Sequence, residues 1–141
     1  MKKVSRRIKT VLDILDDEIK GDINSALKKM DKEYTMTWVY SGKKELFPST
    51  KIVRTEMQEV YPIKGRQYDI KHITEGQNVV MVELVESYPD IKTKKVYRTP
   101  LVLILEFKGN KIKTGRHYCD PRLSYMNLGK KQINSIFKGG T

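Results

Sequence analysis

Apolar residues recur at helical spacing in the first part of the chain. Between residues 4 and 20 they are Ile8, Val11, Leu12, Leu15 and Ile19. The acidic residues Asp13, Asp16, Asp17 and Glu18 are expected on the opposite side, so the pattern predicts an amphipathic helix over 4–20. Gly21 is expected to end this helix, and Asp22 can cap a second one whose apolar positions continue to Met30. Two antiparallel helices therefore open the predicted fold.

The pattern changes twice between residues 33 and 61. The segment 33–40, EYTMTWVY, alternates and is rich in aromatic and β-branched residues, which is typical of a strand. From Thr50 to Tyr61 the apolar residues return to a helical period, and Pro62 blocks its continuation. We therefore expect a first strand at 33–40 and a third, short helix at 50–61.

Four strand-like runs occupy most of the second half of the chain. They are 67–74, 78–87, 95–107 and 111–120, separated by short segments rich in Gly, Asn, Pro and Asp. Because such residues favour tight turns, the runs are expected to form an antiparallel meander. Helices followed by strands are typical of the α+β class.

The run LVLIL at 101–105 is apolar on both faces of its expected strand, and much of VVMVELV at 79–85 is too. A sheet with one solvated face would alternate, so both faces must be covered. The helices can cover one of them. The other is buried either in a homodimer formed through the sheet or in a two-sided core within one chain.

The composition of the 141 residues indicates one globular domain spanning 1–141. No window carries the roughly 18 apolar residues of a membrane span, and charged residues interrupt the N-terminal segment where a signal peptide would need an apolar run. We therefore expect a cytoplasmic protein with no membrane partner. Cys119 is the single cysteine, and His72 and His117 are the only histidines, so neither a metal site nor another cofactor is indicated.

The net charge is +11, from 28 Lys and Arg against 17 Asp and Glu. Such an excess attracts nucleic acid and other anions. The cations, however, lie at the termini and in the turns, and they are not striped along one helix with aromatic residues between them. This distribution indicates a solvated basic surface and disfavours nucleic acid as a partner.

The order of helices and strands, together with three short motifs, resembles a known family. The motifs are IKHITEGQNVVMVELVE, EFKGNKI and the Tyr-x-Asp ending of GRHYCDP. They resemble the SnoaL-like branch of the nuclear transport factor 2-like superfamily, over residues 8–128. Residues 129–141 would then form a C-terminal tail.

This resemblance implies a cone-shaped α+β barrel, in which the N-terminal helices pack into a strongly curved, mostly antiparallel sheet. It also implies a small-molecule pocket inside the cone and a homodimer formed through the sheet. Members of the superfamily include cyclases, isomerases, dehydratases and epoxide hydrolases as well as non-catalytic proteins. The fold alone therefore does not define an activity.

The last strand-like run ends in a possible catalytic group. The face predicted to point inward carries Ile112, Thr114, Arg116, Tyr118 and Asp120. By its position in the motif, Asp120 matches the aspartate that serves as general base in SnoaL-like cyclases. The alternative is that Asp120, which precedes Pro121, only caps the turn through its side chain.

The run 78–87 is expected to bring further polar groups to the pocket. Glu86 and Tyr88 lie on its predicted inner face, although Glu86 could also end the strand in water. In the epoxide hydrolases that the chain resembles, this strand carries an arginine and an aspartate, whereas the matching positions here hold Leu84 and Glu86. Without the arginine an epoxide would not be oriented, so epoxide hydrolysis is disfavoured.

Aromatic residues of the first strand are expected in the core, in the pocket wall or in both. Trp38 and Tyr40 share a side with Tyr34, and Tyr40 is the best placed to offer a hydroxyl. His72 shares a predicted face with Ile70 and is interpreted as a structural histidine.

The predicted function is binding of a hydrophobic, oxygenated small molecule. The candidate ligand contacts are Trp38, Tyr40, Glu86, Tyr88, Arg116 and Tyr118. If the protein is an enzyme, an isomerase- or cyclase-type reaction would use Asp120 as its general base. The alternative is a non-catalytic ligand-binding or dimeric accessory protein, and the sequence does not decide between the two.

Overall fold

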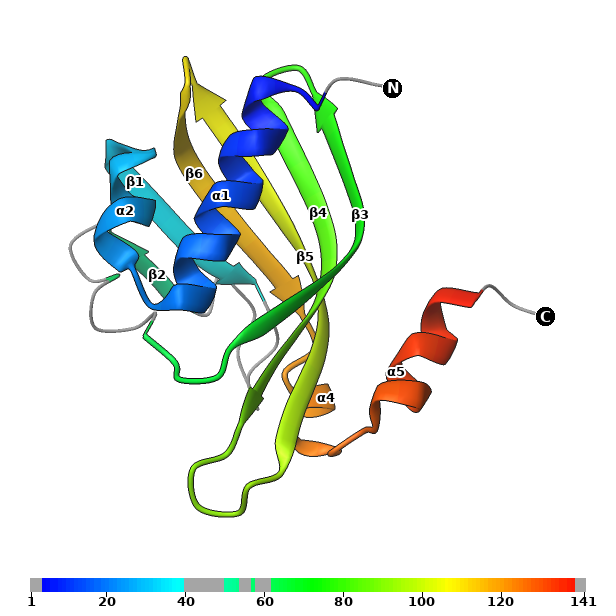
Figure 1. Ribbon diagram of the computed structural model, residues 1–141. Helices are drawn as coiled ribbons and strands as arrows, with labels where there is room; N and C mark the ends of the chain where they lie inside the picture. Colours follow the sequence, from blue (N-terminus) through cyan, green and yellow to red (C-terminus); the bar gives the residue numbers. More distant parts are fainter. Residues whose placement is uncertain (1–3, 40–49, 54–56, 58–61, 139–141) are drawn as a thin grey trace.

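The computed structural model describes residues 4–39, 50–53, 57 and 62–138. Two helices precede a curled sheet, and further helices follow it (Figure 1). The helices are α1 (Arg6–Lys20), α2 (Ile23–Lys28), α4 (Arg122–Tyr125), α5 (Lys130–Ser135) and the 3-10 helix η2 (Ile136–Lys138). The strands are β1 (Met30–Val39), β2 (Thr50–Val53), β3 (Gln67–Gly76), β4 (Val79–Pro89), β5 (Val96–Lys108) and β6 (Lys111–Cys119). No helix in the described part of the chain is long and apolar enough to cross a membrane.

Capping interactions define the two N-terminal helices. The Ser5 hydroxyl accepts a hydrogen bond from the backbone N–H of Ile8 at 3.0 Å and so begins α1. Gly21 ends α1 in the left-handed conformation, with φ at 75°, which glycine adopts without steric cost. The Asp22 side chain then accepts a backbone N–H at 3.2 Å and begins α2. Both predicted helices are confirmed, and α2 ends early because Met30 already belongs to β1.

In the described part of the chain, six strands form one sheet in the order β2-β1-β6-β5-β4-β3. The pairs from β3 to β6 are antiparallel, as predicted for a meander, and β1 runs parallel to β6. The first and last strands of the chain are therefore neighbours inside the sheet.

The prediction of a third helix at 50–61 is wrong for its first four residues. Residues 50–53 form β2, which pairs with β1 in antiparallel register. Three of these four residues are β-branched, and the open edge of β1 offers hydrogen-bonding partners that an isolated short helix lacks. Met57 is helical and 1% exposed; the rest of the predicted helix lies outside the described residues.

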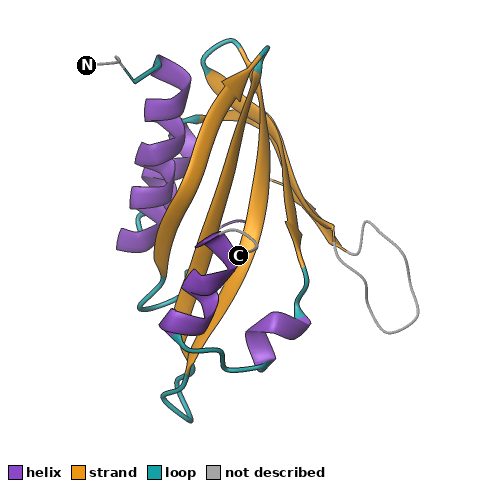
Figure 2. Ribbon diagram, turned by 90° about the vertical axis from the view of Figure 1, so that its right-hand side faces the viewer, coloured by secondary structure: helices purple, strands orange, loops and turns teal. Residues whose placement is uncertain are grey.

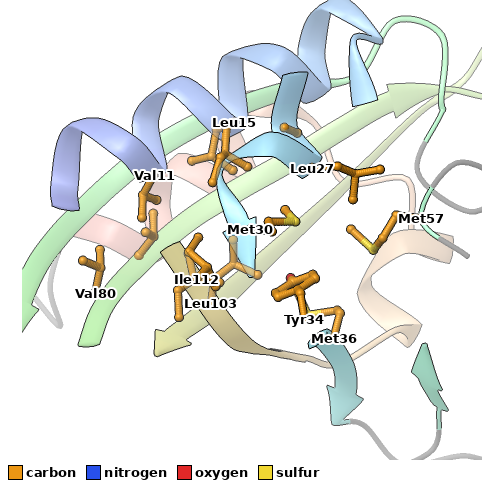
Figure 3. Packing of buried hydrophobic residues seen from close by; sticks show 14 of the residues in the cluster. Val11, Leu15, Leu27, Met30, Tyr34, Met36, Met57, Val80, Leu103 and Ile112 are labelled. Atoms are coloured by element: carbon orange, nitrogen blue, oxygen red, sulfur yellow. The ribbon is translucent and has the colours of Figure 1, made fainter. Parts of the chain in front are cut away.

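The sheet curls strongly around α1 without closing into a barrel (Figures 1 and 2). The α+β class and the curved, mostly antiparallel sheet are thus confirmed. The core fills the concave side, where Val11 and Leu15 of α1 lie opposite Leu103 and Ile112 of the sheet (Figure 3). Each buried side chain of this size stabilises the fold by about 1.5–3 kcal/mol.

A bulge in β6 changes which side chains face the core. Ile112 and Thr114 pair with consecutive residues of β5, which leaves Lys113 as an extra residue in β6. One extra residue reverses the alternation of all later side chains in the strand. The face predicted for β6 is therefore correct only at Ile112.

A second bulge, in β3, has the same effect on His72. Ile70 and His72 pair with consecutive residues of β4, so Lys71 is the extra residue. His72 consequently points to the outer face, where its Nδ1 lies 2.7 Å from Oε1 of Glu83. The prediction that His72 shares a face with Ile70 is wrong for this reason.

The C-terminal segment folds against the outer side of the sheet. Ile133 of α5 is 1% exposed and shares a groove with Val85 of β4, which is 5% exposed. The Lys71 ammonium donates a hydrogen bond to Oδ1 of Asn134 at 3.0 Å and lies 5.0 Å from the ring of Phe137. Residues 130–138 are thus docked, and part of the apolar outer face is covered by the chain itself.

Candidate functional site

A cavity of about 220 Å³ lies between α1 and the concave face of the sheet. Most of its wall is apolar and comes from α1, β1, β5 and β6, including Val11, Leu15, Met36, Leu101, Leu103 and Ile112. Its polar or partly polar side chains are Glu18, Tyr34, Trp38, Arg66, Tyr68, Glu86, Tyr88 and His117. An apolar cavity with a few converging polar groups is typical of a small-molecule site.

Glu18 places a carboxyl group in this cavity from the last turn of α1. It is 6% exposed, and its Oε2 accepts a hydrogen bond from the Tyr68 hydroxyl at 2.9 Å. Burial raises the pKa of Glu18 to about 7, although the Tyr68 hydrogen bond and the positive charge of Arg66 both lower it. The carboxyl group is therefore present in both protonation states near neutral pH.

Arg66 and Glu86 form an ion pair in the cavity wall. The Nε atom of Arg66 lies 3.3 Å from Oε2 of Glu86, and the two side chains are 5% and 18% exposed. Burial raises the pKa of Glu86, whereas the neighbouring Arg66 and Tyr68 lower it. The guanidinium carbon of Arg66 also lies 5.9 Å from the centre of the Tyr68 ring. The cavity thus contains a fixed positive charge beside two carboxyl groups.

A tight turn positions Arg66 at the start of β3. The preceding residue, Gly65, has φ at 81°, and a Cβ atom there would lie 2.8 Å from Cδ of Pro89. Glycine is therefore required for both conformation and space. This close approach brings the start of β3 next to the end of β4, where Tyr68 pairs with Glu86.

His117 and Trp38 form another part of the wall, where β6 and β1 run side by side. The two residues are direct partners in the parallel register, and their ring centres are 6.4 Å apart. Burial lowers the pKa of His117 to about 4, so the imidazole is neutral at neutral pH. Trp38 is the only tryptophan of the chain.

Three of the predicted ligand contacts line the cavity, namely Trp38, Glu86 and Tyr88. Strand alternation predicted their inward direction, which the structure confirms. Tyr40 lies outside the described residues. That any of them contacts a ligand remains a prediction.

Arg116 and Tyr118 lie on the outer face of the sheet. The inward direction predicted for them is wrong, because the bulge at Lys113 reverses the alternation and turns His117 inward. Arg116 instead pairs with Glu106, with Nη1 and Oε2 3.3 Å apart, and Tyr118 is 41% exposed.

Asp120 follows the end of β6 and is not part of the cavity wall. Its Oδ1 accepts a hydrogen bond from the backbone N–H of Arg122 at 3.0 Å, and its Oδ2 lies 2.8 Å from Nη2 of the same residue. These contacts lower the pKa of Asp120. The prediction that Asp120 projects into the pocket is therefore wrong, and the turn-capping alternative describes its contacts.

Four polar residues of the cavity wall were not among the predicted site residues, namely Glu18, Arg66, Tyr68 and His117. The prediction that Glu18 lies with the other acidic residues on the polar side of the first helix is wrong, because Glu18 stands on the apolar stripe of α1, seven residues after Val11, and is buried. No sequence pattern indicated Arg66, because only the folded turn brings this residue next to Glu86.

The chemistry available in the cavity is hydrogen bonding and proton transfer. Its polar groups are carboxyl, guanidinium, phenol and imidazole. Within 4–39, 50–53, 57 and 62–138, no three His, Cys, Asp or Glu side chains are grouped so that they could hold a metal ion.

Comparison with known proteins found similarity to solved structures. A structure described as "a putative polyketide cyclase" from Acidithiobacillus ferrooxidans is 15% identical, with 91% of this chain and 97% of that chain covered and a TM-score of 0.73. An NTF2-like protein of unknown function from Burkholderia xenovorans is 16% identical, with 96% and 95% covered and a TM-score of 0.65. An LEH-like epoxide hydrolase from M. tuberculosis is 13% identical, with 93% and 94% covered and a TM-score of 0.67. No protein-family model and no curated protein matches the chain.

These similarities define the fold. The chain has the NTF2-like fold, with N-terminal helices held in the curve of a mixed sheet, and the resemblance seen in the sequence is confirmed at this level. At these identities the neighbours do not define the activity. The activity has to be inferred from the residues that line the cavity.

Proposed function

We propose that the cavity binds a small, hydrophobic, oxygenated molecule and that Glu18 moves a proton on it. The observation that carries this proposal is a carboxyl group, 6% exposed, in a mostly apolar cavity, where burial raises its pKa to about 7. A general acid or base works best when its pKa lies near the working pH. The reaction class is isomerase- or cyclase-type.

The proton transfer is balanced without any further reactant. The Glu18 carboxylate takes a proton from the carbon next to a carbonyl group, and the electrons of that C–H bond form an enolate. In an isomerisation, the protonated carboxyl group returns the proton to another carbon of the molecule. In a ring closure, the enolate carbon attacks a second carbonyl carbon, and the oxygen of that carbonyl receives the proton.

The neighbouring polar groups support this step. The positive charge of Arg66 stabilises negative charge that develops on the substrate oxygen. Glu86 holds the guanidinium group through the 3.3 Å contact, and the Tyr68 hydroxyl orients the Glu18 carboxyl group through its 2.9 Å hydrogen bond. Trp38 and Tyr88 provide aromatic surface for the apolar part of the ligand.

A binding protein without catalysis is the second candidate. It is favoured by the pairing of the polar groups with one another, since Tyr68 already contacts Glu18 and Glu86 already contacts Arg66. In this case the groups would hold the shape of the cavity, and the ligand would make mainly apolar contacts.

The test is the exchange of the protons beside the carbonyl group of cyclohexanone with deuterium from heavy water, followed by NMR. We expect the protein to accelerate the exchange, at a rate that rises as the pH increases through about 7, because the ionised form of Glu18 is the base. Glu18→Gln should return the rate to that of buffer. Glu83→Gln is the matched control, since Glu83 is a carboxylate on the outer face, 41% exposed.

The outcomes separate the two candidates. Full exchange activity in folded Glu18→Gln would contradict Glu18 as the base. No acceleration by the wild-type protein, although cyclohexanone changes the fluorescence of Trp38, would leave binding without catalysis as the function.

We also propose that a second copy of the chain covers the open part of the outer sheet face. Met81 is 40% exposed there, Tyr118 is 41% exposed, and Ile104 lies in the same shallow groove as Met81. Apolar area of this kind on adjacent strands favours a symmetric dimer. We expect light scattering to give a dimer mass for the wild type and a monomer mass for Met81→Glu; a wild-type monomer would contradict this proposal.

The basic surface does not suggest a further partner. Several of its cations are paired with acids, including Lys9 with Asp13, Lys20 with Asp16 and Lys113 with Glu33. Interleaved acids weaken the attraction to a polyanion. We therefore maintain the expectation of no nucleic-acid partner, which a titration with DNA at low salt would test.

A further inference from the structure

The hydroxyl group of Tyr68 connects the two carboxyl groups of the cavity. It donates a hydrogen bond to Oε2 of Glu18 at 2.9 Å. Tyr68 and Glu86 are direct partners in the antiparallel pairing of β3 and β4, and their side chains also share a hydrogen bond. All three side chains line the cavity. A continuous array of hydrogen-bonding groups therefore runs from α1 through β3 to β4.

A phenol has only one proton to donate. Its oxygen can donate to one carboxylate, and it can accept a hydrogen bond only from a group that carries a proton. When the Tyr68 hydroxyl donates to Glu18, its hydrogen bond with Glu86 therefore requires a protonated Glu86. The converse holds when the hydroxyl donates to Glu86. Both hydrogen bonds are made when the two carboxyl groups hold one proton between them.

The charges in the cavity agree with one shared proton. Arg66 is the one cation among the residues that the structure places in the wall, and its Nε atom lies 3.3 Å from Oε2 of Glu86. With one proton on the two carboxyl groups, the remaining carboxylate balances the guanidinium group. This avoids the cost of burying a net charge. Burial also raises the pKa of Glu18 and of Glu86, which favours a proton on one of them.

The other titratable groups close to Glu18 do not change this balance. Asp17, the preceding residue of α1, is paired with Lys29, and its Oδ2 lies 2.5 Å from Nζ of that lysine. Burial raises the pKa of Tyr34 on β1, so this phenol stays neutral. The proton is therefore shared between Glu18 and Glu86 alone.

The two ends of the array differ in their access to water. Glu18 is 6% exposed, whereas the Glu86 side chain is 18% exposed. A ligand in the cavity would cover Glu18 further. A proton that Glu18 takes from such a ligand therefore reaches water more readily from Glu86 than from Glu18 itself.

We propose that Tyr68 is a proton-relay residue, whose hydroxyl group passes a proton between Glu18 and Glu86. After Glu18 has taken a proton from the substrate, its O–H proton moves to the phenol oxygen while the Tyr68 proton moves to a carboxylate oxygen of Glu86. Two O–H bonds break and two form, so Tyr68 stays neutral and Glu18 is again an ionised base. This inference rests on the proposed function, and it adds the route by which the substrate proton leaves for water.

The bridging position of Tyr68 is tested without any substrate. Tyr68→Phe keeps the ring, whose centre lies 5.9 Å from the guanidinium carbon of Arg66, and removes only the hydroxyl group. Because this hydroxyl stabilises the ionised form of both carboxyl groups, NMR titration of their carboxyl carbons should give higher midpoints for Glu18 and Glu86 than in the wild type. A higher midpoint for Glu18 alone would overturn the bridge.

Tyr97→Phe is the matched control. The Tyr97 hydroxyl also donates to a carboxylate, with 2.7 Å to Oδ2 of Asp90, but Tyr97 is not part of the cavity wall. This variant should leave the midpoints of Glu18 and Glu86 unchanged. Circular dichroism checks that both variants are folded.

The relay itself is tested by the exchange of cyclohexanone protons with deuterium. Deuterium enters the ketone only if the proton on Glu18 is replaced before it returns to the same carbon. In Tyr68→Phe the plateau rate at high pH, where Glu18 is ionised, should fall about tenfold or more. Binding of cyclohexanone, followed by the fluorescence of Trp38, should change little. Tyr97→Phe should keep the full plateau rate.

A variant at the other end of the array separates a relay from two independent effects. Glu86→Gln removes the receiving carboxylate and should also lower the plateau rate, whereas Glu83→Gln on the outer face should not. The double variant of Tyr68→Phe and Glu86→Gln should be no slower than the slower single variant, because both changes remove the same route. Multiplication of the two losses would overturn the relay.

Failure of the relay differs from failure of the proposed function. If the wild type accelerates the exchange and folded Tyr68→Phe keeps the same plateau rate, the relay is wrong and Glu18 remains the base. If the wild type does not accelerate the exchange, the proposed function fails, and the relay falls with it.

Discussion

Glu18 and Asp120 carry the same functional group in opposite surroundings. Glu18 lies on the apolar stripe of α1 and is 6% exposed, and burial raises its pKa to about 7. The Asp120 side chain is 40% exposed after the end of β6, and its contacts with Arg122 lower its pKa. Position in a motif pointed to Asp120, whereas the environment of the carboxyl group points to Glu18. Desolvation is therefore the better guide to acid–base chemistry in this fold.

The two faces of β6 show the same contrast between neighbouring residues. His117 faces the cavity, where burial lowers its pKa to about 4. Arg116 faces outward and pairs with Glu106 in partial contact with solvent. A single extra residue, Lys113, decides which of the two enters the site.

The largest expected effect comes from breaking the buried ion pair. Arg66→Met leaves the Glu86 carboxylate buried without its cation, and should lower the free energy of unfolding by about 3–5 kcal/mol in urea titrations at pH 8. Arg116→Met breaks the outer pair with Glu106 and should cost about 1 kcal/mol or less. Equal losses in the two variants would remove the difference between the inner and outer faces.

The next effect is a dependence of stability on pH that Glu18 imposes. Because its pKa is higher in the folded protein than in the unfolded chain, its contribution is fully present below pH 4.5 and is lost as the pH rises through about 7. Between pH 4 and pH 9 the wild type should lose about 3 kcal/mol relative to Glu18→Gln. Parallel stability curves for the two proteins would contradict a buried carboxyl group.

A smaller effect is expected from filling the space beside His117. In Gly115→Ala the new methyl group would lie 2.8 Å from both the Tyr34 hydroxyl and Cε of Met36, so the midpoint of urea unfolding should fall, with a loss of about 1–3 kcal/mol. Gly129→Ala meets only an ordinary contact, 3.5 Å from Gln132, and should cost less. The reverse order of the two variants would show that the inner face of β6 is not tightly packed.

The smallest effect is expected from Asp120→Asn. Asp120 is exposed and outside the cavity wall, so the exchange of cyclohexanone protons should continue at the wild-type rate. The melting temperature should change little, because the pair with Arg122 is solvated. Loss of exchange in a folded Asp120→Asn protein would support Asp120, the residue that the motif indicated, as the general base in place of Glu18.

Much of the fold could be predicted from the sequence because its signals are local. The apolar stripe of α1, the glycine at its end and the capping aspartate of α2 each act within a few residues. The same holds for the turns of the meander, and the inward direction of Glu86 and Tyr88 follows from simple alternation in β4.

The site was harder to predict because it depends on contacts between distant segments. The bulges at Lys113 and Lys71 arise from pairing between strands, and they reversed the predicted faces of Arg116 and His72. Arg66 reaches Glu86 only through the turn packed against the end of β4. Alternation along one strand contains none of this information.

The most direct test of the account is the titration of the carboxyl groups themselves. The side-chain carboxyl carbons of Glu18 and Asp120 can be followed by NMR between pH 2 and pH 9, with Glu18→Gln and Asp120→Asn to assign the signals. We predict a midpoint of about 7 for Glu18 and one below the ordinary value of 3.8 for Asp120. A Glu18 midpoint near 4.5, the value of a solvated glutamate, would contradict the proposal that this cavity is an acid–base site.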